Sequence, residues 1–217
     1  MLTRRGLIAG GAALLGVGRA RAAAAREPAI VRVRIVTPVG VIIVALDTRR
    51  APGTTTNFLK YVDDERFDDT RFYRAARSKK VPGTGFIQGG IQTDARRILP
   101  PFPFEPTTKT GLRHVDGAIS MARGTDPKSA GGNWVICVGP APQLDGREGY
   151  MGYAAFGRVI AGMAVAKRIL AVPTGGGFDA MKGQMILRPI PILRVERIDG
   201  VKKPTGQPRM WLLFKKR

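Results

Sequence analysis

The sequence predicts a mainly β fold, a barrel or sandwich of short strands in one domain over residues 26–200. Short runs of β-branched and aromatic residues recur along the chain, separated by connections rich in Gly and Pro, a pattern typical of all-β folds. Only two segments show helical spacing. With 44% hydrophobic residues, the 217-residue chain can form one well-buried core but not two large ones.

The first two strands form a hairpin, because residues 30–36 and 39–46 are β-branched runs divided by Thr37-Pro38. A helix follows Pro52, since Pro suits the first helical position and the apolar residues of 54–67 fall near helical spacing. The other expected elements are strands at 72–73, 86–87, 118–121, 134–138 and 154–159, a second helix at 160–170, and a last strand at 190–198.

Residues 1–25 predict an export signal. Arg4 and Arg5 precede an apolar run, and Ala20 and Ala22 supply the small residues of a cleavage site. Two arginines followed by Gly-Leu-Ile resemble the twin-arginine export pattern, and the run is short for a membrane span. We expect removal of residues 1–25 on export to a bacterial periplasm. An amphipathic or disordered N-terminus is the alternative.

The chain is strongly basic, with a formal net charge of +20. Loss of residues 1–25, which hold four arginines and no acid, would leave +16. This charge favours anionic neighbours, or it is a solvated surface. No recognisable basic-aromatic nucleic-acid motif occurs outside the C-terminus, so we expect no specific nucleic-acid partner.

The C-terminal tail, residues 201–217, joins a flexible lead to the apolar cluster WLLF at 211–214, which basic residues flank. Two interpretations are open. The tail contacts an anionic membrane surface through shallow insertion and headgroup attraction, or its apolar cluster packs against the barrel.

The single cysteine and the single histidine limit the possible chemistry. Cys137 cannot form an intramolecular disulfide, and its place in the apolar run WVICV predicts burial in a strand. His114 is expected to be an ordinary turn residue. A zinc site or a Ser/His/Asp triad therefore has weak support, and we expect no metal and no cofactor.

Residues 119–138, ISMARGTDPKSAGGNWVICV, place small and polar residues between two apolar runs, as in a surface loop between strands. The stretch has no obvious nucleophile, base or metal ligand, which suggests action by shape and hydrogen bonding. It resembles the cyclophilin signature, in which a strand ending in Ser-Met-Ala is followed by a loop and a second strand.

Three further blocks resemble cyclophilins, in the family's order and at compatible spacing. They are FYR at 72–74, FIQGG at 86–90, and LDG at 144–146 with AFGRV at 155–159. The resemblance covers about residues 30–199. It implies a closed, eight-stranded antiparallel barrel capped by two α-helices.

The resemblance also implies peptidyl-prolyl cis-trans isomerase activity. Rotation about the X-Pro amide faces a barrier of roughly 18–20 kcal/mol and takes tens of seconds without catalysis. No covalent bond breaks, so no nucleophile, metal or titrating base is needed. The expected partners are proline-containing, unfolded or partly folded exported proteins, and the expected state is a monomer.

Two residues match the catalytic positions of the family. By its Phe-aromatic-Arg context, Arg74 matches the arginine that donates to the prolyl nitrogen during rotation. A guanidinium suits this role because it is always charged and presents directed donors. Gln88 matches the glutamine that orients the substrate and the arginine. The alternatives are a surface arginine, like the nearby Arg71 and Arg77, and a buried strand glutamine that satisfies backbone groups.

Other positions match the substrate-binding residues of cyclophilins. Backbone groups of Ala122 and Arg123 are expected to pair with the substrate, and Asn133 keeps an amide where glutamine is usual. Core packing is the alternative for the apolar residues at the proline-pocket positions, which are Phe86, Val135, Leu144 and Tyr153.

The sequence departs from the family around this pocket. The connection between Arg74 and Gln88 is several residues longer than usual, and Gly85 aligns where a phenylalanine is expected unless Phe86 fills that space from a shifted backbone. Trp134-Val135 replaces Phe-Phe, and Gln143 stands where a tryptophan commonly contacts cyclosporin. A cyclophilin-like binding module or chaperone with little or no turnover is therefore the competing hypothesis.

Overall fold

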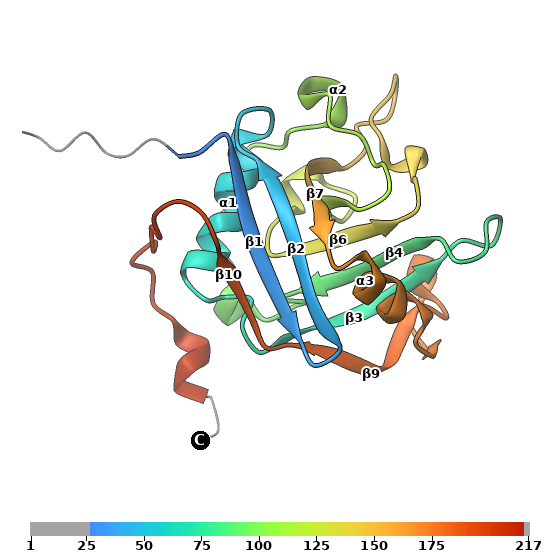
Figure 1. The fold of residues 1–217 in the computed structure, drawn as a ribbon. Helices are drawn as coiled ribbons and strands as arrows, with labels where there is room; N and C mark the ends of the chain where they lie inside the picture. The colour runs from blue at the N-terminus through green and yellow to red at the C-terminus, as the bar shows by residue number, and fades with distance from the viewer. Residues whose placement is uncertain (1–26, 215–217) are drawn as a thin grey trace, which may run out of the picture.

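The computed structural model describes residues 27–214, which form one ten-stranded antiparallel sheet curled around a core (Figure 1). The expected export signal lies outside the described residues. The strand order is β10-β1-β2-β7-β5-β6-β4-β3-β9-β8, which confirms a mainly β fold. The strands are β1 (Ile30–Thr37), β2 (Gly40–Asp47), β3 (Thr70–Arg77), β4 (Gly85–Gly90), β5 (Ala118–Met121), β6 (Asn133–Val138), β7 (Ala154–Ala161), β8 (Thr174–Gly175), β9 (Met185–Ile192) and β10 (Arg194–Arg197).

The expected closed eight-stranded barrel is wrong, because the hydrogen-bonded order ends at β10 and β8 and does not return on itself. The strand expected at 190–198 is divided at Leu193 into β9, which pairs with β3, and β10, which pairs with β1. Pro189 and Pro191 of β9 have no N–H to donate, so this part of the strand cannot support ladders on both edges. The sheet is an open, curled half-barrel.

Two longer helices cover the sheet, as expected, and a third helix of one turn, α2 (Thr107–Thr110), was not foreseen. Helix α1 (Pro52–Asp63) has Pro in its first turn, and the Glu105 carboxylate accepts the N–H groups of Gly53 and Thr54 at 3.0 and 2.8 Å. Helix α3 (Met163–Ala171) begins later than the expected residue 160, because β7 continues to Ala161.

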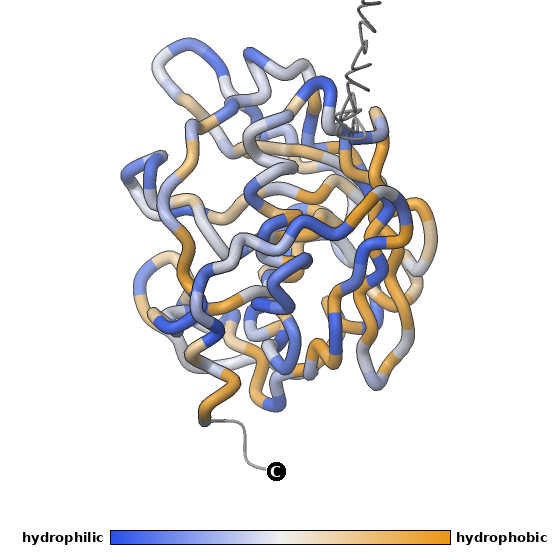
Figure 2. Tube along the Cα trace, turned by 90° about the vertical axis from the view of Figure 1, so that its left-hand side faces the viewer, coloured by the Kyte–Doolittle hydropathy of each residue, from blue (hydrophilic) through white to orange (hydrophobic). Residues whose placement is uncertain are grey.

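The core lies between the inner face of the sheet and the helices α1 and α3. Along β1, Val31, Val33 and Ile35 are buried while the residues between them are half-buried or exposed, as expected for a strand with one face in the core. Figure 2 shows hydrophobic stretches, in orange, alternating with hydrophilic ones, in blue, along the chain. The core contains an aromatic cluster formed by Phe58, Phe67, Phe72, Trp134 and Phe156.

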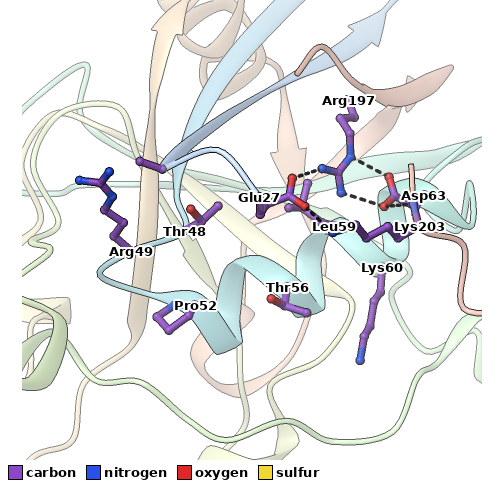
Figure 3. A pocket seen from close by; sticks show the side chains of 11 residues that line it. Glu27, Thr48, Arg49, Pro52, Thr56, Leu59, Lys60, Asp63, Arg197 and Lys203 are labelled. Atoms are coloured by element: carbon purple, nitrogen blue, oxygen red, sulfur yellow. Dashed lines mark hydrogen bonds and ion pairs between the residues drawn. The ribbon is translucent and has the colours of Figure 1, made fainter. Parts of the chain in front are cut away.

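The C-terminal tail runs beside α1 (Figure 1) and is hydrogen-bonded to the end of that helix. Arg197 of β10 donates to both oxygens of Asp63 at 3.0 and 2.8 Å and also contacts Glu27 (Figure 3). The backbone N–H groups of Lys203 and Thr205 then donate to Asp63 and Asp64 at 3.0 and 2.7 Å. The lead of the tail is therefore fixed on the domain.

The apolar end of the tail, orange in Figure 2, divides its side chains between the domain and solvent. Trp211 is buried in contact with two guanidiniums, those of Arg66 and Arg97, which lie 4.8 and 5.1 Å from its ring centroid. Both are favourable cation–π distances. Leu213, on the same 3-10 helix (Met210–Phe214), is 73% exposed. The packing interpretation therefore holds for Trp211, and membrane contact by the tail stays a prediction.

No helix within residues 27–214 is both long enough and apolar enough to cross a membrane.

Truncation of Trp211 tests the structural role of the tail. Trp211→Ala should lower the free energy of unfolding by about 2–4 kcal/mol, because it removes a buried ring and its contacts with two guanidiniums. Leu213→Ala, on the same turn but exposed, should change it by less than about 0.5 kcal/mol. Urea unfolding of both variants measures the difference, and equal effects would contradict the role assigned to Trp211.

Candidate active site

A β-bulge in β3 sets the direction of the residues that form the site. Phe72 pairs with Gly89 and Arg74 pairs with Gln88, so Tyr73 is an extra residue with no partner of its own on β4. A bulge of this kind interrupts the alternation of side chains between the two faces of a sheet. Phe72 thus stays in the core, while Tyr73 and Arg74 both reach Gln88.

These side chains form one hydrogen-bonded chain across three strands. Arg74 Nη1 donates to Gln88 Oε1 at 3.0 Å, and Gln88 Nε2 donates to the Tyr73 hydroxyl at 2.8 Å. That hydroxyl donates to Asn133 Oδ1 at 3.2 Å. Asn133 also accepts from Gln92 N and donates to Gln92 O, both at 2.8 Å. Burial raises the pKa of Tyr73 to about 12, so its hydroxyl keeps the proton that it donates.

The connection between β8 and β9 holds Arg74 from the other side. Arg74 Nε donates to Gln184 Oε1 at 2.9 Å, and Nη2 donates to the Ala180 carbonyl at 3.3 Å. Burial lowers the pKa of Arg74, but a guanidinium starts so far above neutrality that it stays charged. Three of its five N–H groups are bonded in the described part of the chain, which leaves one on each terminal nitrogen.

All nine residues expected at the site line one cavity of about 500 Å³. Arg74, Phe86 and Gln88 come from the β3–β4 hairpin; Ala122, Arg123, Asn133 and Val135 from β5, β6 and their connection; Leu144 and Tyr153 from the segment before β7. Residues that the sequence did not indicate complete the lining, namely Gly124, Ser129, Ala180 and Met181. That these residues bind a substrate stays a prediction.

The aromatic content of the cavity follows from strand alternation. Phe86 and Gln88 are two residues apart on β4 and share its cavity face, with the Arg74 guanidinium 5.0 Å from the Phe86 ring. Phe86 therefore lines the site, even though Gly85 is the residue that the sequence resemblance aligned with the expected pocket phenylalanine. On β6, Trp134 is fully buried in the core and Val135 lines the cavity. The wall at residue 135 is aliphatic, and the rings that remain are Phe86 and Tyr153.

The loop after β5 is braced against Tyr153. The Arg123 guanidinium lies 4.9 Å from the centroid of that ring, and its Nε donates to Gly152 O at 2.9 Å. Ala122 N donates to Asn133 O at 2.9 Å, so the backbone of Ala122 can offer a ligand only its carbonyl. Among the described residues, those that line the cavity include no carboxylate, histidine or cysteine. Its donor and acceptor set suits hydrogen bonding to a peptide rather than metal binding or proton transfer.

The expectation that His114 is an ordinary turn residue is wrong. His114 is 1% exposed, with Nδ1 at 2.6 Å from Asp145 Oδ1 and Nε2 at 2.8 Å from Ser120 Oγ. This is the bonding order of a Ser/His/Asp triad, but Ser120 is fully buried and no substrate can reach its hydroxyl. The network instead ties β5 to the segment that carries Leu144. Its partners are 6 and 31 residues away, and a sequence pattern cannot reveal such contacts.

Two other features lie outside this chemistry. Cys137 is buried in β6, as expected, and burial raises the pKa of its thiol to about 12, so it is not a reactive thiolate. Another cavity, of about 780 Å³, lies between α1 and β10 (Figure 3). Its acidic groups Glu27 and Asp63 are paired with Arg197 and Lys203. This cavity is part of the attachment of the tail.

Comparison with known families agrees with the geometry. The family model described as cyclophilin type peptidyl-prolyl cis-trans isomerase/CLD matches residues 31–197. The chain therefore belongs to the cyclophilin-type family.

Relatives are found among bacterial proteins. Peptidyl-prolyl cis-trans isomerase A of Dickeya dadantii is 35% identical over 142 residues, which cover 65% of this chain and 72% of the relative. Peptidyl-prolyl cis-trans isomerase B of Escherichia coli is 30% identical over 140 residues, covering 63% of this chain and 82% of the relative.

A solved structure shares the fold. The cyclophilin type peptidyl-prolyl cis-trans isomerase of Cryptosporidium parvum, crystallised in the presence of the dipeptide Ala-Pro, superposes with a TM-score of 0.60 at 22% identity. The match covers 78% of this chain and 99% of that one.

The buried His114 predicts a dependence of stability on pH. Burial lowers the pKa of His114, and this effect outweighs the opposing effect of Asp145, whose Oδ2 lies 4.0 Å from Arg113 Nη1. The folded protein therefore takes up the proton at a lower pH than the unfolded chain, in which the pKa of histidine is about 6.5. This contribution to stability is present above about pH 6.5 and is lost as pH falls. The free energy of unfolding should therefore decrease between pH 7 and 5.

His114→Gln separates this effect from other titrations. The variant should be less stable at pH 7, because the network is broken, but it should lose less further stability on acidification to pH 5. Urea unfolding at both pH values measures this. An unchanged pH slope in the variant would contradict the assignment.

Proposed function

We propose that this chain is a peptidyl-prolyl cis-trans isomerase and that Arg74 is its catalytic donor. The observation that carries the proposal is the placement of a charged guanidinium, held by Gln88 and Gln184, in a cavity that no carboxylate of residues 27–214 lines. Membership of the cyclophilin-type family and the names of the bacterial relatives support it.

Catalysis would proceed through hydrogen bonding alone. Rotation about the X-Pro bond removes amide resonance and leaves a lone pair on the prolyl nitrogen, which a remaining N–H of Arg74 can stabilise. The donor acts mainly in the transition state, because the planar amide nitrogen of the ground state accepts poorly. Phe86, Val135, Leu144 and Tyr153 would hold the proline ring, and the Ala122 carbonyl and Asn133 would hold the flanking peptide.

Substitution of Arg74 tests the catalytic donor. Arg74→Ala should reduce kcat/KM for a short Xaa-Pro peptide by roughly a hundredfold, the usual effect of removing one transition-state donor. Arg74→Lys should also be poor, because a point charge does not replace the planar fork. Arg71→Ala, an exposed arginine on the same strand, is the matched control and should keep its rate. Full activity of both Arg74 variants in an NMR exchange assay would refute the assignment.

Gln184 is proposed as a positioning residue for Arg74. Gln184→Ala should lower kcat by about tenfold with little change in KM, because the guanidinium loses the acceptor at Nε but the cavity lining is kept. Gln184→Glu keeps an acceptor and should restore most of the rate. Lys182→Ala, exposed in the same loop, is the control. If Gln184→Ala and Lys182→Ala behave alike, Gln184 has no positioning role.

A proline-peptide binding module with little turnover is the second candidate, favoured by the aliphatic wall at Val135. Fewer rings around the proline would weaken the hold on the rotating imide. The two functions differ in one measurement: a binding module retains peptide in a titration but leaves the cis-trans exchange rate at its uncatalysed value.

We further propose that the clients are exported proteins and that the chain works in the periplasm. The signal-like composition of residues 1–25 supports this placement, and the basic surface fits an anionic envelope. Fractionation of cells that express the full chain, with and without Arg4→Lys and Arg5→Lys together, would test it.

A further inference from the structure

A second cavity, of about 450 Å³, adjoins the proposed proline site. Phe86 lines both cavities. The two are also adjacent at the 3-10 helix Pro142–Leu144, where Leu144 lines the first cavity and Gln143 lines the second. A substrate strand advances about 3.3 Å per residue, so a peptide with its proline in the first cavity brings a residue close to proline within reach of the second.

Backbone hydrogen bonds on one side and two prolines on the other define the walls of this second cavity. On the β3–β4 connection, Ser78 N donates to Thr84 O at 2.8 Å, and Ser78 Oγ accepts from the N–H groups of Lys80 and Val81 at 3.2 and 3.1 Å. The opposite wall contains two prolines, Pro140 and Pro142, whose φ angles are fixed.

The two walls also touch at Gly139. Its φ is +82°, and a Cβ there would meet Thr84 Cγ2 at 2.7 Å, so this position requires glycine for conformation and for space. The longer connection noted in the sequence is therefore an ordered wall, and a ligand pays little ordering entropy to use it.

The polar groups of the second cavity favour an anion. Lys80 is exposed and forms no ion pair in the described chain, and none of the ten lining residues is acidic. Gln143, on the other wall, is also exposed and can donate its amide N–H groups. Lys79 is equally exposed but does not line the cavity. A carboxylate would therefore find an ammonium and an amide donor on two separate segments.

We propose that the second cavity is a specificity subsite that binds an acidic side chain, Asp or Glu, of a residue flanking the proline of the client chain. The subsite rests on the proposed function, because the proline in the first cavity defines its register. Lys80 is its specificity-determining residue.

The test uses acetylated alanine peptides with one central proline. Glu, Gln or Lys is placed singly at each of the two positions before and after the proline, and the dissociation constant and the exchange rate are both measured. At one of these positions the Glu peptide should bind roughly fivefold more tightly than the Gln peptide in low salt, the upper range for an exposed ion pair. The Lys peptide should bind more weakly, and 0.5 M salt should remove the preference.

Two charge reversals decide which residue is responsible. Lys80→Glu should invert the preference, so that the Lys peptide binds better than the Glu peptide. Lys79→Glu, which changes the net charge equally one residue away, should retain the preference for Glu. The proposal is overturned if no position prefers Glu over Gln, or if both reversals have the same effect, since the preference would then reflect net charge alone.

The failure of this proposal is distinguishable from failure of the isomerase function. The reference peptide has alanine at every position around the proline. If its cis-trans exchange is not accelerated, the isomerase proposal fails, while the dissociation constants of the Glu, Gln and Lys peptides still test the subsite. If that peptide is accelerated but the Glu preference is missing, only the subsite fails.

Discussion

The two-for-one pairing at Tyr73 is the constraint on which the site depends. A regular β3 would place Phe72 and Arg74 on the same face, so the sheet would have to bury a guanidinium beside the aromatic cluster or expose a phenylalanine. The bulge removes this conflict by changing the alternation after Phe72. It also lets two consecutive polar side chains meet Gln88, and the chain of hydrogen bonds to Asn133 begins there.

Rigidity is the common property of the groups around Arg74. The guanidinium is held from β4 by Gln88 and from the connection before β9 by Gln184 and Ala180. A reaction that needs no bond breaking gains from donors fixed before the substrate arrives, because little reorganisation is then left for the transition state. The cost is that few N–H groups remain for the ligand, so the orientation of the guanidinium matters more than its charge.

Carboxylates at the two ends of α1 attach distant segments to it. Glu105 accepts the first N–H groups of the helix, where the helix dipole favours negative charge. At the other end, Asp63 and Asp64 hold β10 and the tail. In a chain with many cations and only 16 acidic residues, these few acids are placed where each one fixes several donors. Lys80 is a cation that forms no ion pair within residues 27–214.

The sequence alone determined the local order of this protein. Alternation of apolar residues defined the hairpin of β1 and β2, Pro52 marked the start of α1, and short motifs indicated nine residues that line one cavity. These signals are local, because strand period, helix spacing and motif order depend on neighbouring residues. The same locality explains why residues 190–198 looked like one closing strand, although the chain turns at Leu193 and leaves the sheet open.

Only the tertiary structure decided the contacts between distant segments. Gln184 contacts Arg74 from 110 residues away, and Glu105 caps α1 from about 50 residues away. The buried His114 is hydrogen-bonded to Asp145, which lies 31 residues further along the chain. None of these pairs has a local pattern, since each depends on how the curled sheet brings loops together. Trp211 is the clearest case. The composition of the tail allowed either membrane contact or packing on the domain, and only the contacts of this ring with Arg66 and Arg97, from separate loops, show that it is buried.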